Sequence, residues 1–435
     1  MEAEQSISPV REKEGDTPES SRGSKPEAAS QRAGTQARGN AHGGSGESEF
    51  RRIVRNFTPS WFIITMSTGI LSILLNKLPY NGNWLRIISI ILFVLNVVLF
   101  VLFTALSCLR YILYPQLWSK VIRHPHQSLF LGTFPVGLAT IINMVVIVCV
   151  PAWGQGLATL AWVLWWIDGV LAVAICFHMT WVLMSNRRSN LAHMTALWLI
   201  PIVSIVIAAA AGATVAGVLS NPYHRLWTII ISYCLWGIGM PLSWIILAIY
   251  FLRLTVHEPL PREVIVSALI PVGPLALGSF SIIQLGKLAR TVFPQTNSLP
   301  LVAAAGDTLY VVGFLVALIM WAFAIIWFVI AVVMIAQVRR FPFNMGWWGF
   351  IFPTAIFGLA TSTIGVELES TFFKVLATVV AVFAVLLWIG VACGTLLRSI
   401  TGQMFFAPCL GTDLKAKLAG QDGSSGVEST AHDVV

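Results

Sequence analysis

The sequence predicts an all-α membrane protein, with ten transmembrane helices arranged as five helical hairpins around a central anion pore. Composition is the first indication: 57% of the residues are apolar and 11% are charged, whereas roughly a quarter are charged in a soluble domain. Acidic residues are the second, because nine of the nineteen precede Arg51, four follow Leu410 and only six lie between. The third is a series of apolar runs long enough to cross a hydrocarbon layer of ~30 Å.

The chain divides by composition into three parts. Residues 1–50 are rich in Ser, Glu, Gly, Gln and Arg and offer too little apolar surface to offset the entropy cost of ordering, so we expect a disordered tail. Residues 51–402 hold the apolar runs and form the expected transport domain. Residues 403–435 are polar again and form a second tail. The N-terminus has no apolar stretch typical of a secretory signal, so we expect the first internal run to start membrane insertion.

Ten separate apolar runs are expected to form the spans. They lie at about 58–78, 84–109, 129–150, 157–184, 193–219, 226–252, 264–286, 301–336, 346–366 and 371–397. An even number of spans places both tails on the same side of the membrane. The short connections between successive runs favour antiparallel neighbours, and therefore helical hairpins.

The loop charges predict the orientation. The side of the tails carries fifteen Lys and Arg residues, and the other side carries six, which are Lys77, Arg86, Arg225, Lys287, Arg290 and Lys374. Because cytoplasmic loops are enriched in Lys and Arg, both termini are assigned to the cytoplasm of a multi-pass membrane protein. The net charge of +8 is spread over the ends of the apolar runs, so we predict contact with a lipid bilayer and no nucleic-acid partner.

Motifs for catalysis or metal binding do not occur in the sequence. The six cysteines show no CxxC spacing, and five of them fall inside or beside apolar runs, where cysteine behaves as a small core residue. The chain has no P-loop, no HExxH and no nucleophile elbow, which are the marks of common enzyme classes. We therefore predict a protein that is not an enzyme and that needs no cofactor and no metal.

Prolines recur on alternate helices. The first, third, fifth, seventh and ninth runs carry Pro59, Pro135, Pro201, Pro271 and Pro353 near their cytoplasmic ends. Proline within a helix frees a backbone carbonyl, which is costly to expose to lipid. Membrane helices in general contain more proline than soluble ones, but five in register favour an inner ring of kinked helices around a pore, with the even helices outside.

The candidate lining of this pore is small or polar. We assign the anion path to residues that follow the prolines on the odd runs: Gly137, Thr140, Asn143, Ser204, Gly278, Ser279 and Thr354. Because these runs hold no acid or base away from their ends, an anion would have to be stabilised by helix dipoles and by basic residues at the mouths. The candidates for the mouths are Arg123, Arg187, Lys287 and Arg290, and the alternative for each is ordinary contact with lipid headgroups.

Asp168 is the one carboxylate deep inside a run. An ionised carboxylate at this depth is costly, and such residues are functional candidates. One interpretation is a proton-coupling or conformational switch. The other, which we favour because Asp168 lies on an outer helix, is a polar clasp between helices or subunits, with Thr140 as a candidate hydrogen-bond partner.

Three stretches resemble a known transporter family. They are residues 131–143 (LGTFPVGLATIIN), residues 163–168 (VLWWID) and residues 273–280 (GPLALGSF). The chain is identified on these as a member of the tellurite-resistance and dicarboxylate transporter (TDT) family, which includes the plant slow anion channel, and within it resembles the fungal sulfite-exporting branch. The resemblance covers about residues 50–400.

The resemblance implies a plasma-membrane efflux pump for sulfite or bisulfite that gives sulfite tolerance, with one pore in each subunit of a homotrimer. Residues 346–354 (GWWGFIFPT) are similar to the family segment in which a phenylalanine beside the proline plugs the pore, so Phe352 is the expected gate. A carrier for C4-dicarboxylates such as malate and a gated anion channel remain the alternatives. A malate site would need a basic residue near the middle of the path, and the sequence has none there.

Overall fold

The computed structural model describes residues 49–124, 127–185, 191–258, 260–302, 304–338, 342–401 and 404. The chain divides into two units at Arg51, and the spans discussed below all lie after this point. Every regular element among the described residues is a helix. Both expected tails, 1–50 and 403–435, fall almost wholly outside this part of the chain.

In the described part of the chain, ten helices are long and apolar enough to cross a membrane, which confirms the predicted number. Five begin with a 3-10 turn: η1–α3 (Pro59–Trp61, Phe62–Lys77), η2–α6 (Ser128–Gly132, Thr133–Met144), η5–α9 (Ala196–Leu199, Ile200–Ala216), η6–α11 (Ile265–Leu269, Val272–Thr296) and η7–α13 (Met345–Phe350, Ile351–Glu367). After Met144 the second of these continues as the π-helix η3 (Val145–Cys149) and α7 (Val150–Trp153). The other five are continuous: α4 (Asn83–Leu113), α8 (Gln155–Ser185), α10 (Pro222–Val256), α12 (Ala305–Gln337) and α14 (Thr371–Ile400).

Burial separates these two sets of helices. In α3, α6, α9, α11 and α13, which we call the inner helices, from two thirds to all of the residues in the most apolar stretch are buried. In the outer helices α4, α8, α10, α12 and α14, at most a third of the residues in the corresponding stretch are buried. Helices that are apolar on every side belong in the middle of a bundle, and the apolar outward faces of the other five suit lipid. The sequence-based division into inner odd and outer even helices is therefore confirmed.

The five prolines lie where the 3-10 turns become α-helices. Each is within three residues of the first residue of its α-helix. The first turn of an α-helix tolerates proline because the N–H that proline lacks would have no intrahelical partner there. The prolines thus lie near the ends of the runs, as the sequence placed them, but they set where each inner helix begins rather than kinking it.

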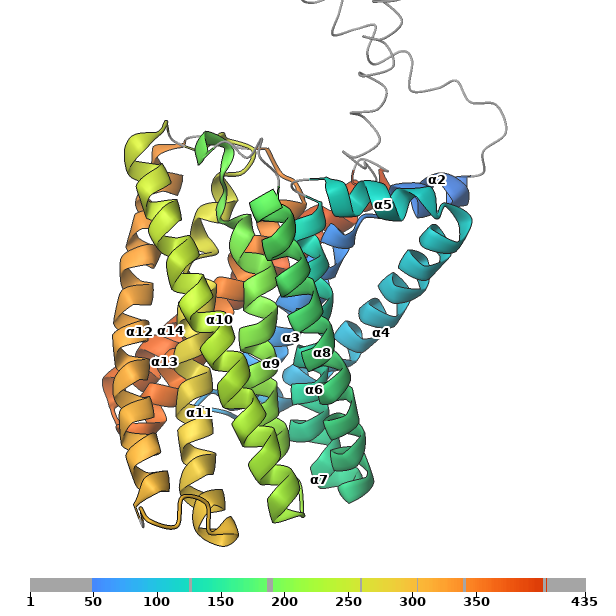
Figure 1. The fold of residues 1–435 in the computed structure, drawn as a ribbon. Helices are drawn as coiled ribbons and strands as arrows, with labels where there is room; N and C mark the ends of the chain where they lie inside the picture. Colours follow the sequence, from blue (N-terminus) through green and yellow to red (C-terminus); the bar gives the residue numbers. More distant parts are fainter. Residues whose placement is uncertain are drawn as a thin grey trace, which may run out of the picture. The chain divides into compact units, whose positions relative to one another are not determined.

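The side on which the inner helices begin and α14 ends is called the tail side below, and the opposite side the far side. Figure 1 shows the outer helices α10 and α12 running along the bundle, while α4 leans away from it toward the tail side. The short helix α5 (Gln116–Arg123) follows α4 and lies across its end. Two further short helices, α2 (Glu49–Asn56) and η4 (Leu191–His193), precede α3 and α9.

Candidate anion path

Three cavities follow one another between the inner helices. The largest is a vestibule of about 500 Å³ on the tail side, lined by the start of every inner helix, for example by Ser60, Phe130, Leu197, Val264 and Met345. A second cavity, of about 20 Å³, shares Ile63, Ile270 and Gly349 with the vestibule. A third, also of about 20 Å³, lies further along the same helices and is called the far cavity.

The residues that line the cavities form one stripe on each of four inner helices, α3, α9, α11 and α13. On α3 they are Ile63, Met66, Ile70, Ile73 and Lys77, on α9 Ile200, Val203, Ile207, Ala210 and Thr214, on α11 and the turn before it Ile270, Gly273, Leu277 and Phe280, and on α13 and the turn before it Gly349, Phe352, Ile356 and Leu359. Successive members are three or four positions apart, which places them on one helix face. The cavities therefore belong to one path through the bundle, whose stripe on α3 is roughly 21 Å long at 1.5 Å per residue.

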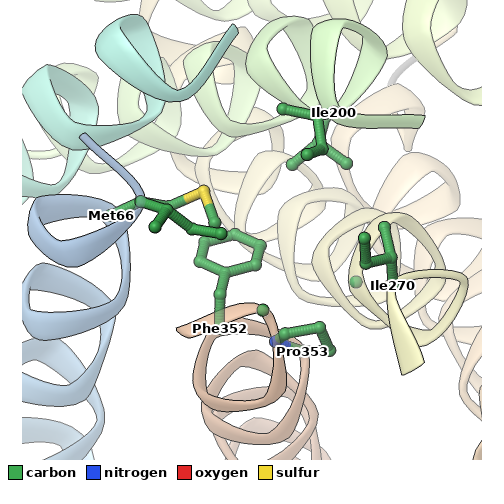
Figure 2. Close-up of a pocket in the computed structure, with 9 residues that line it drawn as sticks. Met66, Ile200, Ile270, Phe352 and Pro353 are labelled. Carbon is green, nitrogen blue, oxygen red and sulfur yellow. The ribbon is translucent and has the colours of Figure 1, made fainter. Parts of the chain in front are cut away.

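Phe352 lines the second cavity of this path. Its side chain is 3% exposed, and Figure 2 shows its ring rising from α13 toward Met66, with Ile200 and Ile270 on other sides of the pocket. Gly273 on α11 faces the ring of Phe352, since a Cβ built at Gly273 would lie 3.7 Å from that ring, in ordinary van der Waals contact. A volume of about 20 Å³ holds little more than one water molecule, so the structure is closed to an anion as large as sulfite.

Polar side chains and helix ends surround the vestibule, and one acid, Glu263, and one base, Arg398, are among its lining. All five inner helices point their N-terminal ends toward it, and these ends carry partial positive charge. The hydroxyls of Thr58 and Ser60 lie 2.6 Å apart on its wall. Arg398 also lines it, donates to the carbonyl oxygen of Phe343 at 2.8 Å and lies over that ring. An anion would be attracted here chiefly by backbone dipoles.

The far cavity has a different chemistry. Its wall is mostly aliphatic, with the polar residues Asn143, Thr214 and Lys77 among its lining. Asn143 precedes the π-helix η3 (Val145–Cys149), and Ile147 within that π-helix lines the same cavity. A π-helix re-aims side chains relative to an α-helix, and here Ile147 joins Asn143 of α6 in the wall of the far cavity.

Of the predicted path residues, Asn143 alone lines one of the three cavities. Gly137 lies against Thr65 and Phe100, and Gly278 lies against Met240 and Met320 of the outer helices. The hydroxyl of Ser279 donates to Ala317 of α12, and those of Thr140, Ser204 and Thr354 donate to the backbone of their own helices. The prediction is wrong for these six residues, because small residues serve here to bring helices close together, and hydroxyls satisfy backbone carbonyls within the bundle.

The predicted mouth residues do not lie together in the structure. Lys287 forms an ion pair with Glu367 at 2.6 Å, and Arg290 forms one with Asp307 at 2.7 Å. Glu367 is 10% exposed and also accepts a hydrogen bond from Tyr310 at 2.6 Å. Arg123 is exposed at the end of α5 and lines none of the three cavities, while Arg187 lies outside the described residues. The basic residues chosen for the mouths are thus not brought together around the path.

Asp168 is fully buried on α8. Neither carboxylate oxygen has a hydrogen-bond partner among the described residues. The hydroxyl of Thr140 donates to Gly137 at 2.7 Å and accepts from Asn96 at 3.3 Å, so the expected bond between Asp168 and Thr140 is not formed. The clasp within one chain is therefore not supported by the geometry of the described residues.

Sequence reasoning missed the aliphatic lining and Lys77. The signal for the lining was present as isoleucine and valine at intervals of three and four on α3 and α9. It could not be distinguished from ordinary packing, because every face of a buried helix is apolar. Lys77 was counted among the loop charges, although it lies one turn beyond Ile73 on the face of α3 that lines the path.

Comparison with known proteins agrees with this architecture. Residues 56–396 match the family model SLAC1, described as a voltage-dependent anion channel. The sulfite efflux pump SSU1 of Trichophyton rubrum is 45% identical over 352 residues, which cover 81% of this chain and 93% of that protein. SSU1 of Arthroderma benhamiae is 46% identical over the same shares. The malic acid transport protein of Schizosaccharomyces pombe is 25% identical over 77% of each chain.

Proposed function

Because the chain belongs to the SLAC1 family of voltage-dependent anion channels, we propose that it exports sulfite or bisulfite across the plasma membrane and so confers sulfite tolerance. The observation that carries the proposal is the identity of 45–46% over 81% of the chain with two sulfite efflux pumps, compared with 25% for the malic acid transport protein. The chain is a multi-pass transport protein and not an enzyme.

The lining of the path supports a small anion as substrate. Between the vestibule and Lys77 the lining residues are aliphatic, aromatic, Gly, Pro, Asn or Thr, with no formal charge among those described. A second carboxylate, such as that of malate, would have to cross this apolar stretch without a counter-charge, which is costly. The tail-side vestibule offers an arriving anion the helix N-terminal ends and Arg398, with Glu263 also on its wall.

The proposed orientation places the tail side in the cytoplasm. It rests on the excess of Lys and Arg in the loops on that side. In this orientation the inner helices present their N-terminal ends to the cytoplasm, which favours anions in the vestibule. Sulfite would then enter from the cytoplasm, cross the constriction when Phe352 swings aside, and leave through the far cavity.

A homotrimer is part of the proposal. The outer helices expose many large apolar side chains, such as Val98 and Val101 on α4 and Ile319 on α12. Both lipid and neighbouring subunits can cover such faces. Each subunit keeps its own complete path, because all the cavity residues come from a single chain. Native mass spectrometry of the purified protein checks this, and a monomer would contradict it.

Proteoliposome flux tests the proposed function. Purified protein is reconstituted, and the flux of sulfite, malate, nitrate and chloride is measured under imposed pH gradients and voltages. We expect sulfite to be carried well and malate poorly. Malate flux equal to or faster than sulfite flux would replace the proposal by a dicarboxylate carrier, and comparable flux of all the inorganic anions would replace it by a gated anion channel.

A further inference from the structure

Lys77 is the last residue of α3 and ends the stripe that lines the path. Among the described residues that line the far cavity, it is the one with a formal charge. No carboxylate in the described part of the chain forms an ion pair with it, and no hydrogen bond from its ammonium group is found there. An unpaired cation thus stands at the far end of an otherwise apolar path.

The neighbouring cations on the far side are neutralised. Lys287 is close enough for its charge to act on Lys77, but it is held by Glu367 at 2.6 Å, and Glu367 is fixed in turn by Tyr310. Arg290 is held by Asp307 at 2.7 Å. These pairs leave Lys77 as the group at the far cavity that is free to attract an anion.

The helix ends make such a cation necessary for an anion to pass. The inner helices all run from the tail side to the far side, so their C-terminal ends, which carry partial negative charge, surround the far exit. The same dipoles that attract an anion into the vestibule therefore repel it at the exit. A positive side chain on the lining offsets that repulsion where it is greatest.

We propose that Lys77 is the anion-binding residue of the far cavity and holds sulfite as it leaves the constriction, an inference that rests on the proposed function. The ammonium group offers three hydrogen-bond donors to the oxygens of a small oxyanion. Asn143 lines the same cavity and uses one of its two amide hydrogens on Ala139, so the second can donate to the same anion. The sulfite site is therefore built from α3 and α6.

Lys77→Gln tests this assignment by removing the charge and keeping a polar side chain. Sulfite flux into proteoliposomes is measured separately for each orientation, as a function of sulfite at the far side and at the tail side. We expect the half-saturating sulfite concentration at the far side to rise about tenfold, with a much smaller change at the tail side. Lys77→Arg keeps the charge and should stay within about threefold of the wild type.

Arg86→Gln is the matched control, because Arg86 is an exposed cation on the same side, near the start of α4, that lines none of the three cavities. If Lys77→Gln behaves like Arg86→Gln while the wild type carries sulfite, Lys77 serves only lipid headgroups and the assignment is wrong, although the proposed function stands. An effect of Lys77→Gln that appears in anionic but not in neutral lipid leads to the same conclusion. A wild type that carries no sulfite overturns both.

Discussion

Replacing Phe352 by alanine tests whether its ring closes the path. The ring is buried among Ile63, Met66, Ile200 and Ile270, and it must leave this aliphatic pocket before an anion can pass. Burial of a Phe side chain is worth about 1.5–3 kcal/mol. If opening must overcome that amount, its removal should raise sulfite flux by about 10- to 150-fold, since ~1.4 kcal/mol of barrier corresponds to a factor of ten.

The stability cost of Phe352→Ala should be moderate. A fully buried Phe→Ala change costs about 3–5 kcal/mol, but one side of this ring borders a cavity that joins the vestibule, where water can replace part of the lost volume. We therefore expect a cost at or below the lower end of that range, and a folded protein in detergent. Selectivity among sulfite, nitrate and chloride should weaken, because the narrowest part of the path would be lost.

Phe357→Ala provides the control in the same helix. Phe357 is 5% exposed, and its ring stacks on Trp321 and Phe328 of α12, away from the path. The assay is sulfite flux into proteoliposomes at equal amounts of folded protein. If Phe352→Ala is no leakier than Phe357→Ala, the ring of Phe352 is a packing element and the path is closed elsewhere.

Substitutions at two further positions probe the bundle. Asp168→Asn should keep most of the sulfite transport and its pH dependence if the carboxylate has a structural role. Asp168→Ala should lower the melting temperature, because it leaves space in a buried site. Loss of pH-dependent flux in folded Asp168→Asn would instead identify proton coupling. Gly349→Leu should lower sulfite flux below that of the wild type. A Cβ built at Gly349 has open space around it, so the larger side chain would fill the space between the vestibule and the ring of Phe352. Flux at or above the wild-type level would show that the ring does not move toward the vestibule.

The ten spans and their division into two sets were accessible from the sequence. Each apolar run exceeds the thickness of the hydrocarbon layer, and the prolines at the starts of alternate runs correctly marked the inner helices. Their role was misjudged because a proline in an apolar run looks the same whether it bends a helix or begins one. Only the 3-10 turns of the fold, such as η6 (Ile265–Leu269) before Pro271, distinguish the two.

The lining of the path was not accessible in the same way. Selection of small and hydroxylated residues assumed that a path for anions is polar, whereas Ser279 and Gly278 face the outer helices. Glu367, at the end of α13, forms an ion pair that the sequence does not indicate. Its partners Lys287 and Tyr310 come from α11 and α12, which are distant in the sequence. A single sequence gives no sign that these residues are in contact.

The unequal sizes of the cavities determine how the gate can open. The ring of Phe352 needs a space larger than itself, and the far cavity offers about 20 Å³ whereas the vestibule offers about 500 Å³. If Phe352 is the proposed gate, its ring would therefore swing toward the tail side, past Gly349, which lines both the vestibule and the second cavity. An anion that arrives through the vestibule would then meet the ring in the same space. If Phe352 is the gate, the helix N-termini would hold the anion against the vestibule wall while the ring turns.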